Sequence, residues 1–317
     1  MNEKAKGYIL GAIAAATYGM NPLFALPLYK VGMDPDSVLF FRYLFAIPVL
    51  GIKIKARGRD FKLQKKEIIP LIIMGFLIAF SSLALFLSYN YMAAGIASTI
   101  LFVYPILVAL IMALFFKEKI TLQTVICIAL ALGGIGLLYK GEDGTTLNLT
   151  GIILIMGSAL SYAIYIVGAN RPLLKNIATL KLTFYVLVFG LVLFLARIDF
   201  GQSLYILDSD QWYLWGNLLA LAIFPTAISF LCTTLAVQYI GSTPTAILGA
   251  LEPVTAVFFG VTIFGEPFTV RVCCGILMII CAVTFIIAGG NITTYMVRFR
   301  KMFPRIPIKR IHFKTKK

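Results

Sequence analysis

The sequence predicts an all-α polytopic membrane protein, with ten transmembrane helices arranged as two inverted five-helix repeats. Apolar residues make up 60% of the 317 residues and charged residues only 13%. That leaves too little polar surface to enclose a soluble globule of this length. The other two observations are a series of long apolar runs and an internal repeat that relates the two halves of the chain.

The apolar runs place the predicted transmembrane helices. About 20 apolar residues in a helix cross roughly 30 Å of hydrocarbon, and ten runs of about that length occur. They lie at residues 7–29, 35–52, 68–90, 93–116, 121–139, 151–168, 179–196, 212–237, 241–264 and 269–288. The first run is too long, and too soon followed by another, to be a cleavable signal peptide.

The second half of the chain repeats the first at a nearly constant offset. At an offset of 148, Tyr91, Pro105, Phe116, Glu118 and Thr121 correspond to Tyr239, Pro253, Phe264, Glu266 and Thr269. At an offset of 144, Gly7, Ile9, Leu10, Ala15 and Tyr18 correspond to Gly151, Ile153, Leu154, Ala159 and Tyr162. Each repeat holds five spans, and an odd number turns the second copy over in the bilayer. Inverted repeats are typical of transporters with a substrate site near the midplane.

This repeat and the polar segments divide the chain into four parts. We expect a first five-helix repeat at 7–139, an external linker at 140–150, a second, inverted repeat at 151–288 and a basic cytoplasmic tail at 289–317. The linker is expected outside because five spans separate it from a cytoplasmic N-terminus.

The distribution of Lys and Arg predicts this topology. With the N-terminus in the cytoplasm, 23 of the 28 basic residues lie on the cytoplasmic side, as the positive-inside rule requires. Both termini are therefore expected in the cytoplasm of a multi-pass protein of the plasma (inner) membrane. The net charge of +15 is thus explained without nucleic acid. The tail is expected to contact anionic lipid headgroups, and the alternative is a solvated tail that only helps to set orientation.

Small residues and prolines shape individual helices. The first run carries a stripe without side-chain bulk, which lets another helix approach closely: Gly7, Gly11, Ala15 and Gly19. Pro22 and Pro27 follow and predict a kink in its outer half. Pro105 and Pro253 occupy equivalent places and predict either a hinge or a static bend in both halves.

Two glutamates are shared by both repeats. Glu118 and Glu266 each lie at a bilayer surface, three residues before a Thr and shortly before an apolar run. We interpret both as groups that start a helix and order a loop.

Two charged residues lie deep within predicted spans, far from their ends, where insertion of a charge costs about 2.5 to 3.5 kcal/mol. Arg42 and Glu252 are expected at similar depths, so they could form a pair in at least one state. Glu252 corresponds to Tyr104 in the first repeat, and no basic residue corresponds to Arg42. For Glu252 the alternative is a protonated, hydrogen-bonded acid near Pro253. For Arg42 it is a side chain that reaches the outer headgroups.

Polar residues on helix faces complete the candidate site. In the sixth run, Ser158, Ser161, Tyr162 and Tyr165 share one face, which is expected to look into a cavity. Tyr18 and Asn21 lie at midplane depth in the first run, and Thr226, Ser229 and Thr233 share a side of the eighth. The alternatives are hydrogen bonds within a helix for Ser and Thr and between helices for Tyr. The predicted substrate-binding residues are Tyr18, Asn21, Arg42, Tyr104, Ser158, Tyr162, Tyr165 and Glu252.

Other chemistries find little support. The sequence has no Gly-x4-Gly-Lys-Ser/Thr loop and no HExxH motif, and its one histidine, His312, lies in the tail. We expect no metal, no cofactor and no enzymatic activity. All five cysteines fall in predicted spans and are expected to be buried apolar residues rather than disulfides or ligands.

The set of motifs resembles the EamA-like family of the drug/metabolite transporter superfamily. The resemblance rests on the ten spans, Arg42-Tyr43, Pro105 with Glu118, Glu252-Pro253 and Gly265-Glu266-Pro267, and it covers nearly all of residues 7–288. Lys117-Glu118 departs from the fuller Gly-Glu signature. The resemblance implies a secondary transporter, usually an exporter, of small metabolites such as amino acids or amphipathic compounds. The alternatives are a proton-coupled exchanger that uses Glu252, a passive channel and an intramembrane enzyme. The resemblance does not identify the substrate or the oligomeric state.

Overall fold

The computed structural model describes residues 3–117, 122–139, 148–169, 171–175, 177–200, 204–240, 245 and 248–285. Within these ranges the regular structure is helical throughout. Seven helices are long and apolar enough to span a membrane, and three shorter apolar helices lie at Val125–Leu138, Leu251–Phe264 and Val270–Phe285. Each of them falls within or across a predicted span, as expected for a multi-pass membrane protein. Glu118, most of the linker at 140–150 and the tail at 289–317 lie outside the described residues.

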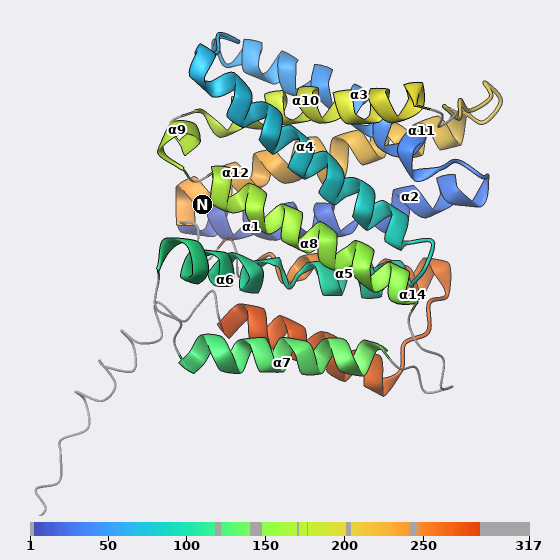
Figure 1. Cartoon of the computed structure of the whole chain (residues 1–317). Helices are drawn as coiled ribbons and strands as arrows, with labels where there is room; N and C mark the ends of the chain where they lie inside the picture. Colours follow the sequence, from blue (N-terminus) through green and yellow to red (C-terminus); the bar gives the residue numbers. More distant parts are fainter. Residues whose placement is uncertain are drawn as a thin grey trace, which may run out of the picture.

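The helices run roughly parallel to one axis, with the N-terminus at one end of the bundle (Figure 1). The first half contains α1 (Glu3–Gly19), α2 (Asn21–Lys30), α3 (Pro35–Ala56), α4 (Lys65–Ser88), α5 (Ala94–Leu101), α6 (Tyr104–Phe116) and α7 (Leu122–Tyr139). The second contains α8 (Leu149–Ala169), α9 (Pro172–Lys175), α10 (Thr179–Asp199), α11 (Trp212–Ala222), η1 (Ile223–Ile228), α12 (Ser229–Ile240), α14 (Leu251–Phe264) and the last helix, Val270–Phe285.

Prolines lie at breaks in three spans. These are the first span and the fourth span of each half. The first span breaks at Met20, two residues before Pro22, which accounts for the predicted kink. The predicted span 93–116 is two helices, because α5 ends at Leu101 and α6 begins at Tyr104, next to Pro105. A turn at 249–250 precedes α14 and Pro253 in the second half. Both repeats therefore have a broken helix at the same place.

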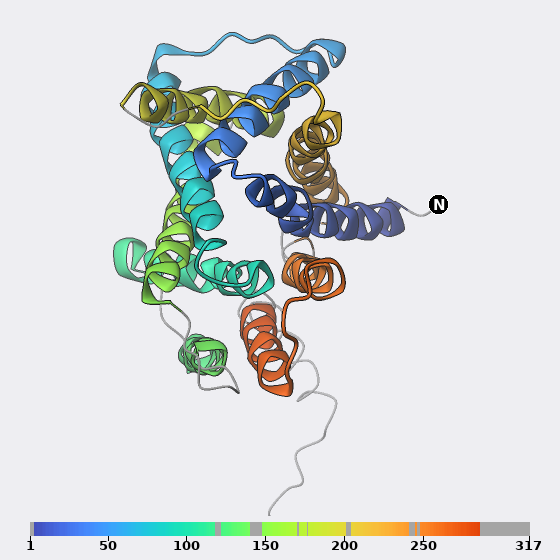
Figure 2. The ribbon, with the colours of Figure 1, turned by 90° about the vertical axis from the view of Figure 1, so that its right-hand side faces the viewer.

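The two halves are held together by equivalent contacts. The first helix of each half packs on the third of the other, as α1 on α12 and α8 on α4. The Ser229 hydroxyl donates to the Ala14 carbonyl at 2.9 Å, and the Ser81 hydroxyl donates to the Ser158 carbonyl at 3.0 Å. Ser81 corresponds to Ser229 at the offset of 148, and Ala14 to Ser158 at 144. Figure 2 shows the two columns, with α4 and α8 on one side and α1 and α12 on the other.

Glycines let these helices approach closely. A Cβ on Gly7 would lie 2.7 Å from Cβ of Tyr239, and a Cβ on Gly151 would lie 2.9 Å from Cβ of Tyr91. These four residues are two repeat-related pairs. The stripe on α1 therefore does what the sequence predicts, because it brings α12 against the first helix.

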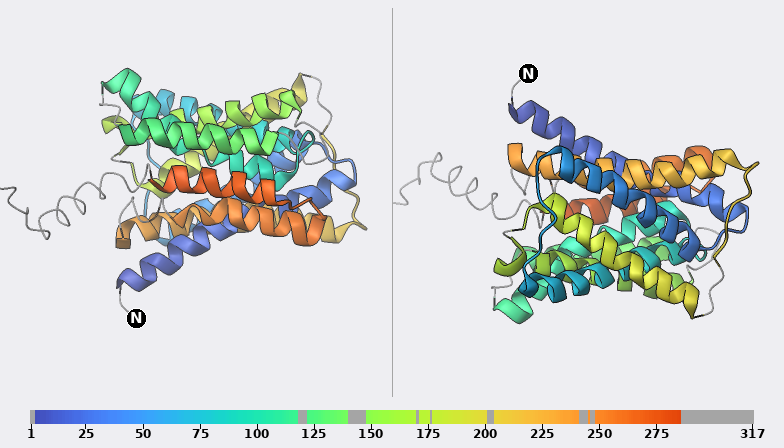
Figure 3. Two further views of the ribbon diagram at one scale, coloured as in Figure 1. Left: turned by 90° about the horizontal axis from the view of Figure 1, so that it is seen from below. Right: turned by 90° about the horizontal axis from the view of Figure 1, so that it is seen from above.

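The helices α3 and α10 are antiparallel and are ion-paired at both ends. The Arg197 Nε lies 2.5 Å from Asp36 at one end, and the Lys181 Nζ lies 2.9 Å from Asp60 at the other. The hydrogen bond from Lys181 holds the pKa of the exposed Asp60 carboxyl below its usual range. Seen from above in Figure 3, α3 and α10 lie together on the near face.

The last helix of each half forms a separate layer. Seen from below in Figure 3, α7 and Val270–Phe285 are nearest the viewer. Their backbones approach closely, since a Cβ on Gly134 would lie 2.8 Å from the Gly275 carbonyl oxygen. The Arg271 Nε donates to the Leu137 carbonyl at 3.1 Å. The guanidinium of Arg271, at the start of the last helix, thus provides a hydrogen-bond donor to a carbonyl of α7.

Two expectations need correction. Of the cysteines, only Cys127 is buried, and Cys274 and Cys281 are exposed on the helix surface that lipid would cover. Placement within a span does not decide which way a side chain faces. Glu266 does not start the helix that follows it, because its carboxylate accepts from the backbone N–H groups of Ala94 at 2.6 Å and Gly95 at 3.1 Å. It caps α5, in the other half.

A shared helix ending supplies a test of the repeat. Lys117 ends α6 at φ 55° and Gly265 ends α14 at φ 68°, 148 residues later. The left-handed conformation costs a residue with a Cβ about 1 to 2 kcal/mol. We expect Lys117→Gly to raise the free energy of unfolding by about 1 kcal/mol and Gly265→Ala to lower it by a similar amount.

Thermal and denaturant unfolding of the purified protein in detergent measures both changes. Lys117→Ala is the control, because it removes the charge and keeps the strained backbone, so it should leave stability near that of the wild type. Shifts of the same sign in Lys117→Gly and Gly265→Ala would contradict this account of the two helix ends.

Candidate functional site

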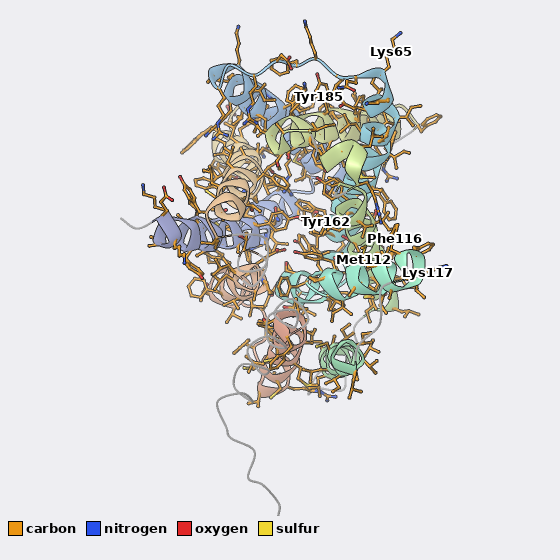
Figure 4. The ribbon with its side chains drawn as sticks, turned by 90° about the vertical axis from the view of Figure 1, so that its left-hand side faces the viewer. Lys65, Met112, Phe116, Lys117, Tyr162 and Tyr185 are labelled. Atoms are coloured by element: carbon orange, nitrogen blue, oxygen red, sulfur yellow. The ribbon has the colours of Figure 1, made fainter. Side chains whose placement is uncertain are left out.

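A cavity of about 230 Å³ lies between the column of α4 and α8 and the column of α1 and α12. We call it the central cavity. Its wall contains Gly11, Ala14, Ala15, Tyr18, Tyr104, Tyr162, Ser229, Phe230, Thr233, Thr245, Gly249 and Glu252. Tyr18 is its limit along α1, and Gly11 is the wall residue nearest the start of that helix. Figure 4, viewed from the end that carries Lys65 and Lys117, shows Tyr162 near the middle of the bundle.

Four of the predicted site residues meet on this wall, and each comes from a different helix. They are Tyr18 of α1, Tyr104 of α6, Tyr162 of α8 and Glu252 of α14. The rings of Tyr104 and Tyr162 are 4.7 Å apart and meet edge to face at 83°. Such a pair holds two aromatic rings in a fixed relation. Whether these residues bind a substrate stays a prediction.

Glu252 stands at the start of α14, directly after the break in its span. Its position in the first helical turn places the carboxylate at the positive end of the helix dipole. Its carboxylate makes no hydrogen bond or ion pair with another described residue. The alternative of a hydrogen-bonded structural acid is therefore not what this structure shows. The acid is free to receive a partner from the cavity.

Arg42 lies on the far side of Tyr18 and Tyr162, at a void of about 30 Å³ that these tyrosines also line. We call it the Arg42 void. Arg42 is only 5% exposed, its Nε donates to the Thr226 hydroxyl at 3.0 Å, and its guanidinium lies 5.4 Å from the centre of the Phe86 ring. It neither reaches the headgroups nor pairs with Glu252 in this structure. Similar depth along two helices does not ensure lateral contact.

The remaining three predicted residues do not line either space. Ser158 is fully buried and exchanges hydrogen bonds with Ser81 of α4, and Ser161 donates to the Leu77 carbonyl at 2.9 Å. The prediction that this face of α8 looks into a cavity is therefore wrong for its serines, which instead join α8 to α4.

Tyr165 does not reach the cavity wall, because its ring stacks behind that of Tyr162, with the ring centres 6.0 Å apart. Asn21 is 2% exposed and its Oδ1 has no partner among the described residues.

The two spaces have related walls. Ser81, Ser82 and Leu85 line the Arg42 void, and their partners at an offset of 148, Ser229, Phe230 and Thr233, line the central cavity. Tyr18 and Tyr162 correspond at an offset of 144 and line both. Part of the wall of the Arg42 void is therefore equivalent, across the two repeats, to part of the wall of the central cavity. Phe230, which lines both spaces, was not predicted, because a Phe in an apolar run carries no distinguishing signal.

Contacts between the halves close the end of the bundle beyond the Arg42 void. Arg197 pairs with Asp36, whose side chain is 5% exposed. The backbone N–H of Tyr205 donates to the Ser37 hydroxyl at 2.9 Å, and its phenol donates to the Val31 carbonyl at 3.1 Å. The central cavity lies on the N-terminal side of Tyr18, and on the opposite side these contacts join the two halves.

Comparison with known proteins agrees with this architecture. A sequence profile of the EamA-like transporter family matches the chain twice, at residues 5–140 and 149–288. An uncharacterized transporter of Archaeoglobus fulgidus is 28% identical over 80% of this chain and 87% of its own length. The uncharacterized transporter YetK of Bacillus subtilis is also 28% identical, over 72% of this chain and 70% of its own. One solved crystal structure aligns with a TM-score of 0.64 at 18% identity, over 92% of this chain and 99% of that one. That likeness shows the fold.

Close packing beside the cavity gives a second test. A Cβ on Gly19 would lie 2.4 Å from the backbone oxygen of Glu252 and 2.8 Å from Cβ of Thr255. Because a backbone atom cannot rotate away, Gly19→Ala should push α14 from α1 and lower stability by about 1 to 3 kcal/mol. The melting temperature in detergent measures this loss.

Gly136→Ala is the matched control. Gly136 lies within α7, and no atom lies within 4 Å of an added Cβ. It should leave the melting temperature unchanged or raise it. If the Gly19→Ala and Gly136→Ala variants had the same melting temperature, the contact between α1 and α14 would not be as close as described.

Proposed function

The chain belongs to the EamA-like transporter family, and from that premise we propose that it moves small organic metabolites, such as amino acids or amphipathic compounds, by alternating access around the central cavity. It is a multi-pass membrane transporter of the drug/metabolite type. The proposal adds the mechanism, secondary transport with export or facilitated diffusion, and the site. Tyr18, Tyr104, Tyr162 and Glu252 would contact the solute.

The proposed mechanism, in which the two halves exchange conformations, requires halves related by an in-plane axis, and several observations support that relation. The family profile matches each half separately. Contacts between the halves come in exchanged pairs, such as Ser229 with Ala14 and Ser81 with Ser158. In Figure 1, α1 runs from the N-terminal end toward α2, and α8 runs back toward α9 at that end. Oppositely directed equivalent helices are what an inverted repeat predicts.

The proposed orientation places the N-terminal end of the bundle in the cytoplasm of the plasma (inner) membrane. The loop between α3 and α4, with Arg57, Arg59 and Lys62, lies at that end, as does Lys181. The opposite end carries few basic side chains among the described residues, such as Lys30 and Arg197. This asymmetry supports cytoplasmic termini. The contact of the tail with anionic headgroups stays part of the proposal.

The observation that carries the mechanism is the pair of related spaces. The central cavity of about 230 Å³ and the Arg42 void of about 30 Å³ share Tyr18, Tyr162 and Phe230, and Ser229 and Thr233 on the cavity wall are the repeat equivalents of Ser81 and Leu85 at the void. If the halves exchanged conformations, the void would open and the cavity would close. A passive channel would need both spaces open together, and here only one is wide.

Repeat-equivalent cysteines test this exchange in a variant that lacks the five native cysteines. Thr233→Cys lies on the cavity wall and should react with a membrane-impermeant maleimide applied from the N-terminal side. Leu85→Cys, its partner at the void, should be protected. Adding Asp36→Asn removes the ion pair to Arg197 and should shift both labelling rates reciprocally, about two- to fivefold, as expected for an interaction of about 0.5 to 1 kcal/mol.

Lys65→Cys, at the exposed N-terminal end of α4, is the control and should label from that side throughout. Simultaneous fast labelling of both wall cysteines would indicate an open pore. Labelling of both from the same side would show that the spaces do not face opposite sides of the membrane.

A second candidate function, exchange coupled to protons, is favoured by one observation. Glu252 is an acid in the cavity wall without an ion-pair partner among the described residues. Such a carboxyl can take up a proton from one side and release it on the other.

Transport into proteoliposomes, with and without a pH gradient, tests the coupling with a solute found by thermal-shift screening. The wild type should accumulate the solute only with the gradient, and Glu252→Gln should equilibrate it without accumulation. Equal rates and no accumulation in both proteins would exclude coupling through Glu252.

A further inference from the structure

We propose that the central cavity takes a small organic cation, an amine with an aromatic or aliphatic body and no carboxylate. This inference names the substrate class and rests on the proposed function, since it concerns the same cavity. It follows from the chemistry of the wall rather than from the family. The wall presents one carboxyl group, several aromatic rings and the hydroxyls of Ser229 and Thr233, which are oriented as acceptors.

The Glu252 carboxyl group on the wall has no counterion among the described residues. Glu252 is the only Asp, Glu, Lys or Arg among the described wall residues. Arg42 is the closest candidate for a counterion, but its guanidinium is held by Thr226 and the Phe86 ring behind Tyr18 and Tyr162. An ionised carboxylate away from bulk water is costly unless it is paired. A cationic ligand would supply the missing partner.

Two hydroxyls on the wall are already committed as donors. The Ser229 hydroxyl donates to the Ala14 carbonyl and the Thr233 hydroxyl to the Ser229 carbonyl, each at 2.9 Å. A hydroxyl has one hydrogen and two lone pairs, so these oxygens can offer the cavity only acceptors. An ammonium group has donors alone and matches them. A carboxylate on the ligand would find neither of these hydrogens and no Lys or Arg among the described wall residues, so its side-chain donors would be limited to the remaining hydroxyls, such as the phenols of the tyrosines.

The rings complete an environment suited to a cation. Tyr104 and Tyr162 stand edge to face, with ring centres 4.7 Å apart and ring planes at 83°. Ring faces attract ammonium groups, by about 0.5 to 2 kcal/mol according to how dry the site is. Tyr18 and Phe230 add two more aromatic side chains to the wall. At about 230 Å³, below the range of drug-sized pockets, the cavity suits a small body with one charged group.

Four probes of similar shape and different charge test the proposal on the purified, full-length protein. They are 2-phenylethylammonium, the neutral 2-phenylethanol, the anionic 3-phenylpropanoate and the zwitterion L-phenylalanine. Isothermal titration and thermal shift measure binding. We expect the ammonium ion to bind, and each of the other three to bind at least about thirtyfold more weakly, the fold-change equivalent to about 2 kcal/mol.

Two variants locate the charge that selects the cation. Glu252→Gln keeps the size of the side chain and should weaken binding of the ammonium ion by about thirtyfold or more. Glu67→Gln is the matched control, because Glu67 caps α4 through the Gln64 N–H, away from the cavity. It should bind like the wild type. The melting temperature of each unliganded variant shows whether it folds.

The outcomes separate this inference from the proposed function. Binding of the alcohol, the anion or the zwitterion as tight as that of the ammonium ion would overturn the substrate class. So would a Glu252→Gln protein that binds the cation normally, or a wild type that binds none of the four. None of these results bears on reciprocal cysteine labelling, which tests alternating access without a ligand. Failure of that labelling, with selective cation binding intact, would instead overturn the mechanism.

Discussion

The structure depends on the packing of the first helix of each half against the third helix of the other. The pair α1 and α12 and the pair α4 and α8 are each held by a serine hydroxyl on a carbonyl and by glycines that permit close approach. In lipid, where apolar side chains gain little by leaving the solvent, such close packing and hydrogen bonding supply the association energy. The cavity lies between these two tightly joined pairs, so its width can change without separating either.

The same constraint explains where the helices break. Hydrocarbon offers no partner for a freed N–H or carbonyl, so irregular backbone survives only inside protein or beside a wet cavity. The breaks before Pro105 and Pro253 lead into α6 and α14, whose first turns place Tyr104 and Glu252 on the cavity wall. The first backbone N–H groups of α5 donate to the Glu266 carboxylate from the opposite half. A residue that looks like a local helix start is therefore also a link between repeats.

What the sequence could predict follows from what periodicity measures. Apolar length located the spans, and the shared residue types located equivalent positions, so Tyr18, Tyr104, Tyr162 and Glu252 could be placed at one depth. Periodicity does not tell which neighbour a face meets, and Ser158 accordingly meets α4 rather than the cavity. Depth also does not give lateral distance, which is why Arg42 is separated from Glu252. The exposed Cys274 shows the same limit, since lipid and protein interior look alike in composition.

The two charged residues break the symmetry of the repeat. A ligand can shift the balance between two states only by binding them unequally, and repeats with identical walls would bind it equally from both sides. Here the symmetry is broken at two places. Glu252 stands where the first repeat has Tyr104, and Arg42 stands where the second repeat has Val186. If the proposed exchange opens the Arg42 void, a cation that enters beside Glu252 leaves past a guanidinium that repels it. Binding would then be tighter on the cytoplasmic side and release easier on the other, while the driving force of the proposed export would come from a gradient of the solute or of a coupled ion.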